Sequence, residues 1–409
     1  MDAPYAARIA FVVELAEHLH AYGTTTQRLE LAIVAVSQRL GLECEPWTNP
    51  TGMILSFSDP ALPLGTSDTT RVLRLPPGDT DLARLGEADR IAESVLSGEI
   101  GLGEGQVALD RLAQPPGTRA RALEVLGFSV LAAAVAALLR LPWLDIATAG
   151  VTGLLLGTLV QLARPRPRLR EAEEAVAGLV AGFVAVLVAA FVGPLNQNTV
   201  IIASVIALLP GLTLTNAMSE LAAGHLVAGT ARFSGAVTSV LKLTVGTVLA
   251  VSLAQAAGIE PQVRGLRPQP EWVEWGGLAA AALSFAVLFR AARRDYPIVM
   301  LAAAAGYLIS RYAGLAWGSP AGIFLAAFAL TAAGNAYARW WNRPGALVRV
   351  PGIIMLVPGS ASLRSLLTLF QQQDVTGGQL ALLGVINILA AVIAGLLFGN
   401  LLVSARRNL

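Results

Sequence analysis

From about residue 121 onward, the charged residues of this chain fall mainly in short clusters between long apolar runs. A helix that crosses the hydrocarbon core of a bilayer needs about 20 mostly apolar residues, and these runs are of that length. Only 14% of the 409 residues are charged, whereas a soluble protein usually has about 25%. The sequence therefore predicts a mostly α-helical, polytopic membrane protein. We expect ten spans, at residues 122–140, 143–163, 173–193, 197–216, 228–256, 272–291, 296–313, 319–338, 346–369 and 378–403.

The first 117 residues have an ordinary density of Asp, Glu and Arg and are predicted to form a small soluble α+β domain. Apolar residues recur there first at helical spacing and then in short runs that Pro, Gly and Asp separate. We expect helices at 6–20, 26–40, 81–97 and 103–112, and strands at 43–47, 53–57 and 69–75. The domain assignment is then 1–117 for the soluble domain, and 118–260 and 261–409 for two five-helix membrane repeats.

The distribution of arginines predicts the orientation of the spans. When ten spans are threaded, the basic clusters after spans two, six, eight and ten fall on one side of the membrane. These are Arg164, Arg166, Arg168 and Arg170, then Arg290, Arg293 and Arg294, then Arg339, Arg343 and Arg349, and last Arg406 and Arg407; the other side has Arg264, Arg267 and Arg311. Because Lys and Arg concentrate in cytoplasmic loops, we expect both termini and the soluble domain in the cytoplasm.

Two Pro-Gly pairs interrupt membrane-length apolar runs. Pro210-Gly211 lies in the fourth expected span, and Pro358-Gly359 lies in the ninth, 148 positions later. Proline lacks the N–H group and crowds the preceding turn, so each pair breaks its helix. An offset of five spans is odd, so the two halves would cross the bilayer in opposite directions. Broken helices at matching places of inverted repeats are typical of the binding sites of secondary transporters.

Small polar residues follow each break and are the candidate substrate ligands. Hydroxyl and amide groups suit the carboxylate and ammonium of a zwitterion, and the N-terminus of a half-helix favours a carboxylate. The alternative is that these side chains only satisfy backbone carbonyls at the kink. The predicted substrate-binding residues are Pro210, Gly211, Thr213, Thr215, Asn216, Pro358, Gly359, Ser360, Ser362, Arg364 and Asn387.

Two ionisable residues are candidates for coupling to an ion. Lys242 is predicted to lie deep in the fifth span, where a charge is costly and usually functional; a structural counter-charge is the alternative. Glu220, near His225, is the second candidate, with a solvated loop as the alternative.

Several classes of function are disfavoured. A net charge of +2 with dispersed cations does not suggest a nucleic-acid partner. The single Cys44 excludes an internal disulfide and a cysteine-based metal site, and we expect no metal, no cofactor and no enzymatic activity. No Gly-rich loop with a following Lys-Ser/Thr is present for an ATP-driven pump. The remaining alternatives are a membrane-anchored hydrolase, for which the soluble domain lacks a credible nucleophile–base set, and a channel.

The chain resembles the threonine/serine exporter family over nearly its whole length. The resemblance rests on Tyr22-Gly23, Arg28-Leu29-Glu30, Gly41-Leu42 and Pro50-Thr51-Gly52, on 208–217 with Glu220, Gly224, Gly229 and Arg232, and on 350–354 with 357–360. It implies a bacterial inner-membrane exporter of threonine and serine, driven by the proton gradient through alternating access, with a cytoplasmic N-terminal domain and ten spans. The expected partners are the amino-acid substrate and the lipid bilayer, and a homo-oligomer is compatible with the sequence.

Overall fold

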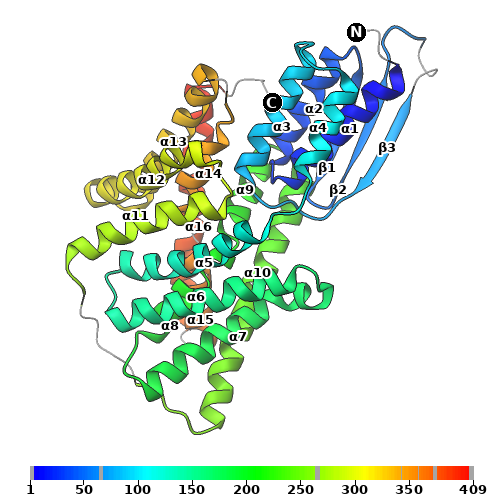
Figure 1. Cartoon of the computed structure of the whole chain (residues 1–409). Helices are drawn as coiled ribbons and strands as arrows, with labels where there is room; N and C mark the ends of the chain where they lie inside the picture. Colours follow the sequence, from blue (N-terminus) through cyan, green and yellow to red (C-terminus); the bar gives the residue numbers. More distant parts are fainter. Residues whose placement is uncertain are drawn as a thin grey trace.

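The computed structural model describes residues 4–63, 68–262, 268–341, 343–357, 359–371 and 375–404. The chain is mostly helical, with one three-stranded sheet near its N-terminus (Figure 1). The sheet and the helices around it form one end of the molecule, and the long helices form the rest. This confirms the coarse prediction of a small α+β region followed by a helical membrane part.

The N-terminal region, which we call the N-domain, has all the elements predicted for it. They are α1 (Tyr5–Ala21), α2 (Thr26–Arg39), β1 (Glu43–Asn49), β2 (Gly52–Ser58), β3 (Thr69–Arg74), α3 (Leu82–Leu96) and α4 (Leu102–Leu112). The sheet is antiparallel in the order β1-β2-β3, with Cys44 opposite Phe57 and Met53 opposite Leu73. The alternate residues Met53, Leu55 and Phe57 of β2 are buried in a core with Phe11 of α1. Helices α1 and α2 therefore cover one face of the sheet.

The rest of the chain consists of long helices and two interrupted ones. The uninterrupted helices are α5 (Thr118–Leu138), α6 (Trp143–Ala163), α7 (Pro167–Phe191), α10 (Leu226–Ala256), α11 (Glu271–Leu288), α12 (Tyr296–Trp317), α13 (Ser319–Trp341) and α16 (Val375–Leu402). The interrupted ones are α8 (Gln197–Ser204), η1 (Ile206–Leu208) and α9 (Gly211–Ala222), and then α14 (Ala346–Ile354) and α15 (Gly359–Gln371). A short turn, η2 (Arg293–Asp295), precedes α12.

Within the described ranges, eight segments are long and apolar enough to cross a membrane, and a ninth is obtained if the bent pair α8 and η1–α9 counts as one span. Helix α11 occupies the sixth expected span but is not among them. The exact count of ten spans therefore stays a prediction.

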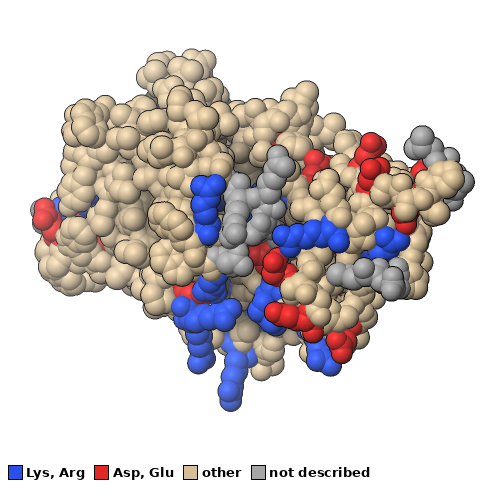
Figure 2. All heavy atoms as spheres, turned by 90° about the horizontal axis from the view of Figure 1, so that it is seen from above, with Lys and Arg blue, Asp and Glu red and all other residues tan. Residues whose placement is uncertain are grey.

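The surface of the helical part fits a lipid environment. Large apolar side chains such as Val245, Leu301 and Leu382 are exposed on it, and extended apolar surface on a chain of this kind marks membrane contact. Seen from the side of the N-domain, the charged residues gather over one part of the molecule, and much of the remaining surface carries none (Figure 2).

The helices pack in a similar way in the two halves. In the first half α5 packs on α6 and α7 on α10; in the second, α11 packs on α12 and α13 on α16. Small residues allow these close contacts, since a Cβ on Gly395 of α16 would lie 2.6 Å from the Cβ of Ala327 of α13. The halves meet where α5 packs on α11.

Two turns occupy corresponding places in the halves. Arg140 after α5 and Arg290 after α11 have positive φ angles of 54° and 49°, which non-glycine residues rarely adopt. A buried aspartate follows each, Asp145 and Asp295. Asp145 accepts hydrogen bonds from the backbone and side chain of Asn196, at 3.2 and 2.8 Å. Asp295 accepts from Arg343 at 2.9 Å. Each aspartate thus ties the second helix of its half to the start of the interrupted helix.

The N-domain docks on the second half through the start of α3. The backbone N–H groups of Leu82 and Ala83 donate to the carbonyls of Phe289 and Arg290, at 2.9 and 3.2 Å. These are free donors of a helix N-terminus and free acceptors at a helix C-terminus, so each end satisfies the other. We call the end of the membrane part that contacts the N-domain the N-domain end, and the opposite one the far end.

Candidate functional site

The first Pro-Gly pair interrupts its helix as predicted, because η1 ends at Leu208 and α9 begins at Gly211. A bend of 53° lies just before it, between Gln197–Ser204 and Ile206–Ala222. Pro210 precedes the first residue of α9, and Gly211 begins that helix. In the second half, α14 ends at Ile354 and α15 begins at Gly359; Pro358 lies outside the described residues. Both predicted breaks are therefore present.

The two breaks lie against each other in the interior. A Cβ on Gly211 would lie 2.5 Å from Cγ1 of Val357, and one on Gly359 would lie 3.1 Å from Cβ of Leu209 and 3.4 Å from Cα of Gly211. A side chain at position 211 would force Val357 to move, and one at position 359 would crowd Leu209, so the two glycines allow the close approach of the breaks. Segments almost 150 residues apart in sequence are therefore in direct contact.

The interrupted helices run in opposite directions through this crossing. The end of α9 reaches the N-domain, where Glu220 accepts a hydrogen bond from Thr26. The start of α14 also lies at the N-domain end, and α15 continues toward the far end (Figure 1). Helices α9 and α15 both begin at the crossing, so their N-termini, with free N–H groups and positive dipole ends, face the same region.

A cavity of about 720 Å³ extends from the crossing toward the N-domain end. Gly211, Thr213, Gly359 and Ser360 line its inner end. Apolar side chains form its walls, and charged side chains and the loop 78–80 surround its outer part. The wall residues include Phe128, Leu131, Phe285 and Leu288, and the charged ones are Glu124, Arg164, Arg170, Glu173, Glu174 and Arg290, with Asp79 from the N-domain loop. An apolar cavity with a few polar groups at its end is the usual form of a small-molecule site.

Two other predicted residues, Thr215 and Asn216, line a different cavity on the opposite side of α9. It measures about 130 Å³ and lies between α9, α14 and α16 of the membrane part and α1, α2 and α3 of the N-domain. Helical geometry separates Thr215 from Thr213, because positions two apart point to different sides of a helix; Asn216 lines the smaller cavity beside Thr215. The single predicted cluster after the first break is therefore divided between two cavities.

The structure does not bring the remaining predicted ligands to the large cavity. Arg364 is exposed on α15, and Asn387 is exposed on α16 among apolar side chains such as Ile386. Ser362 is partly buried and lines neither cavity described here. The substrate roles of these three residues stay predictions that the geometry does not favour.

Lys242 lies closer to the N-domain end than its position in the apolar run suggests. Its Nζ donates to the backbone carbonyl of Glu171 at 2.8 Å and lies 3.4 Å from Oε2 of Glu174. Both acidic residues belong to the first turns of α7, and α10 is long enough to extend beyond the apolar part of its neighbours. The ammonium group is thus paired near a helix end, and its coupling role stays a prediction.

Glu220 joins the membrane part to the N-domain. The carboxylate is 2% exposed and accepts hydrogen bonds from Nε of Arg232 at 2.9 Å and from the backbone N–H of Thr26 at 3.0 Å. The second bond satisfies a free donor at the N-terminus of α2. Nearby, Nδ1 of His225 lies 3.5 Å from Oε2 of Glu30. Glu220 is therefore buried in a helix and paired, so the alternative of a solvated loop is wrong. Its coupling role stays a prediction.

The sequence analysis did not predict a site role for three charged residues that line the smaller cavity. Arg28 of α2, Asp89 of α3 and Arg349 of α14 line it together. Burial raises the pKa of the Asp89 carboxyl to about 7, although the positive charge of Arg28 opposes this rise. Burial also lowers the pKa of the Arg28 guanidinium. The position of Arg349 inside an apolar run could have marked it as a candidate. In the sequence, Arg28 and Asp89 look like ordinary surface residues of amphipathic helices.

No group of three or more His, Cys, Asp or Glu side chains suited to a metal occurs in the described part of the chain. Charged side chains in the described interior form ion pairs, such as Glu220 with Arg232, or line the two cavities. The polar chemistry of both cavities comes from hydroxyls, amides, carboxylates and guanidinium groups.

Comparison with known proteins gives matches over most of the chain. Residues 10–254 match the family model described as "Putative threonine/serine exporter", and residues 277–402 match the one described as "Threonine/Serine exporter, ThrE". A "Probable threonine/serine exporter" of Mycobacterium tuberculosis is 26% identical over 97% of this chain and 76% of its own length. A "Threonine/serine exporter" of Corynebacterium glutamicum is 26% identical over 73% of this chain and 63% of its own length.

Fungal proteins also match. "Pheromone-regulated membrane protein 10" of Saccharomyces cerevisiae is 25% identical over 90% of this chain, which spans 48% of that protein. The chain thus covers about three quarters of the mycobacterial relative and less than half of the yeast one. No solved structure matches. The first family model alone covers more than half of the chain, and the residues that it matches include the first helix break and the Glu220–Arg232 pair. The chain belongs to the threonine/serine exporter family.

Proposed function

We propose that this protein exports threonine and serine by alternating access, driven by the proton gradient. The relatives named as threonine/serine exporters support the substrate class. The observation that carries the proposal is the contact between the two helix breaks at the inner end of the 720 Å³ cavity. Two helix N-termini face that point and favour a carboxylate. The hydroxyls of Thr213 and Ser360, which line the same end, can bond the ammonium or hydroxyl group of the substrate.

We propose further that the membrane part consists of ten spans in two inverted five-helix repeats. The opposite directions of α9 and α15 support this arrangement, and so do the matching positions of Asp145 and Asp295, which follow corresponding turns. Repeats of this kind place substrate sites where their broken helices meet.

The N-domain end is proposed to face the cytoplasm. The arginines at the mouth of the large cavity, Arg164, Arg170 and Arg290, belong to the basic clusters that favour a cytoplasmic position. The cavity would then receive substrate from the cytoplasm in this conformation. Export requires a second conformation, in which the halves rearrange around the crossing and open it toward the far end.

If the protein is an exporter, liposomes that contain the purified protein should show flux of labelled threonine or serine. An imposed proton gradient should accelerate this flux, and a proton ionophore should remove the acceleration. Liposomes without protein give the background. Flux that is indifferent to the proton gradient and proportional to concentration over a wide range would indicate a channel. Absence of flux, together with hydrolysis of a dipeptide, would indicate the membrane-anchored hydrolase.

The hydroxyls at the crossing should determine substrate affinity. Replacing Thr213 with valine or Ser360 with alanine removes one hydrogen bond at nearly constant shape, which is worth about 0.5–1.5 kcal/mol. We expect the KM of threonine flux to rise by up to about tenfold for each variant. Asn387→Leu, on the exposed side of α16, is the matched control and should leave the KM unchanged. A rise with Asn387→Leu but not with Thr213→Val would remove the crossing from the site.

A further inference from the structure

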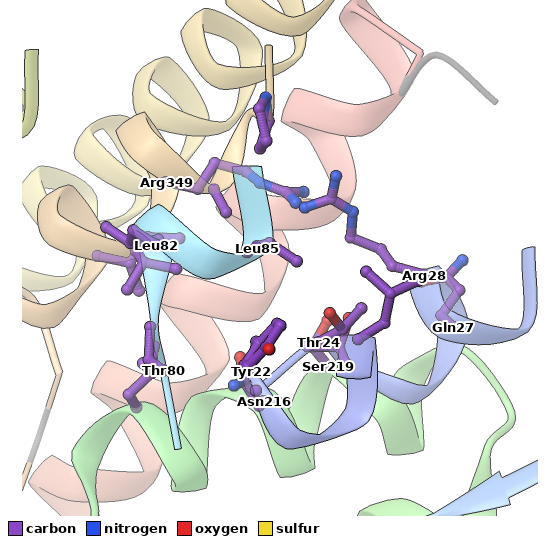
Figure 3. A pocket seen from close by; sticks show the side chains of 18 of the residues that line it. Tyr22, Thr24, Gln27, Arg28, Thr80, Leu82, Leu85, Asn216, Ser219 and Arg349 are labelled. Atoms are coloured by element: carbon purple, nitrogen blue, oxygen red, sulfur yellow. The ribbon is translucent and has the colours of Figure 1, made fainter. Parts of the chain in front are cut away.

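The smaller cavity forms a second pocket, separate from the crossing. It lies on the other side of α9 and is lined by both the N-domain and the membrane part. Thr24 and Arg28 come from the N-domain, and Ser219 and Arg349 come from α9 and α14 (Figure 3). Thr215 of α9 also lines the pocket. An occupant of this pocket would therefore contact both parts of the protein.

Two like charges face each other in the pocket. The side chains of Arg28 and Arg349 extend toward each other, and their guanidinium groups meet end to end (Figure 3). The aliphatic part of the Arg349 side chain fits there because residue 334 of α13 is glycine. A Cβ on Gly334 would lie 2.6 Å from Cγ of Arg349. Two facing guanidinium groups repel each other unless an anion lies between them.

Among the described residues, Asp89 is the one acidic side chain in the lining of this pocket. Its negative charge acts on Arg28, but no described residue forms an ion pair or a side-chain hydrogen bond with Arg28 or Arg349. Asp89 carries one negative charge at most, so the pocket keeps an excess of positive charge. A small molecule with at least one negative group would balance this charge.

The pocket also contains unsatisfied hydroxyls. Oγ1 of Thr24 and Oγ1 of Thr215 are buried without a hydrogen-bond partner in the structure, and Thr215 is 1% exposed. A buried polar group without a partner costs free energy and indicates an absent ligand or water. These hydroxyls lie in the same pocket as the arginines and add neutral donors and acceptors to the positive charge.

We propose that this pocket binds a small hydroxy- or amino-carboxylate, with its carboxylate between Arg28 and Arg349 and its polar substituent toward Thr24 and Thr215. Guanidinium groups bind carboxylates through paired N–H groups, and the volume of about 130 Å³ admits only a small molecule. The ligand removes the repulsion between the two arginines and so fixes the N-domain on the membrane part. This gives the N-domain a role as a sensor of small carboxylates, which goes beyond export itself.

Protection of a cysteine tests the proposal on the full chain in detergent, without any gradient. Ser219→Cys places a thiol on the pocket wall with little change of shape. The native Cys44 is buried, and burial raises the pKa of its thiol to about 11, so it reacts slowly with N-ethylmaleimide. The unsubstituted chain measures that background. We expect L-threonine and L-lactate to slow the labelling of Ser219→Cys at least fivefold, and L-threoninol, which lacks the carboxylate, to have no effect.

The variants decide whether the protection comes from this pocket. Arg28→Gln and Arg349→Gln, each combined with Ser219→Cys, should abolish it, whereas Arg39→Gln, an exposed position of the same helix α2, should keep it. Protection by L-lactate but not by L-threonine would assign the pocket to hydroxy acids, and protection by both would assign it to either class. Equal protection by threoninol or by sulfate, no protection by any carboxylate, or protection that persists in both Arg→Gln variants would overturn the proposal.

Discussion

Gly211→Ala is expected to reduce threonine export by about ten- to a hundredfold while the protein still inserts and folds. The new methyl group would lie 2.5 Å from Cγ1 of Val357, a β-branched side chain with little freedom to move. Overpacking of this kind costs about 1–3 kcal/mol, and 1.4 kcal/mol corresponds to a factor of about ten. The strain is relieved by separating the two breaks, which removes the contact that we place at the substrate site. The measurement is the initial rate of export in liposomes at matched protein content.

Two further variants make this prediction specific. Val357→Ala removes the Cγ1 atom and leaves Cβ 3.2 Å from the added methyl group, so the double variant Gly211→Ala with Val357→Ala should recover much of the flux. Gly276→Ala on α11, where a Cβ would meet nothing within 4 Å, is the control and should transport like the unsubstituted chain. Full activity of Gly211→Ala would mean that the close approach of the breaks has no part in transport.

Glu220→Ala is expected to release the N-domain from the membrane part. The substitution leaves the largely buried Arg232, whose side chain is 14% exposed, without its counter-charge. It also leaves the N–H of Thr26 without an acceptor. Removing one partner of a buried pair costs about 3–5 kcal/mol, so the apparent melting temperature should fall by roughly 5 °C. Trypsin should also cut faster at Arg111 and Arg119, on either side of the segment 113–117 that joins α4 to α5.

An exposed ion pair of the N-domain provides the control. Glu93→Ala removes the partner of Arg39, but both side chains are about half exposed, at 48% and 53%, and such pairs contribute little. It should change neither the melting temperature nor the cleavage rate. Glu220→Leu combined with Arg232→Met should be less destabilising than Glu220→Leu alone, because no unpaired charge remains. Equal effects of Glu220→Ala and Glu93→Ala would contradict the docking role.

Sequence patterns were sufficient for the local structure. The change from helical spacing to short runs identified the three strands, and the Pro-Gly pairs identified both breaks, because proline and glycine act on the backbone within one turn. The family resemblance followed from motifs that the structure explains in part. For example, Gly229 allows α10 to lie against Ala217 and Leu221 of α9, and Glu220 pairs with Arg232.

The sequence could not predict which side chains line which cavity. Helical spacing places Thr213 and Thr215 on different sides of α9, but a break changes the rotational phase of a helix, so the sequence could not show which side faces the large cavity. The depth of Lys242 depends on how far α10 extends past its neighbours, which hydropathy does not report. Arg28 and Asp89 become buried only because another part of the chain covers them, and a tertiary contact of that kind leaves no local pattern.

The docking of α3 onto α11, together with the bond from Glu220 to Thr26, has a mechanical consequence. One anchor belongs to the second half of the membrane part and the other to the first, so the N-domain is a brace between them. If the halves rock against each other, the brace must tilt as a rigid body or lose one anchor. In the proposed alternating-access cycle, the energy barrier would then depend in part on the hydrogen bonds of these two anchors, which lie outside the crossing of the helix breaks.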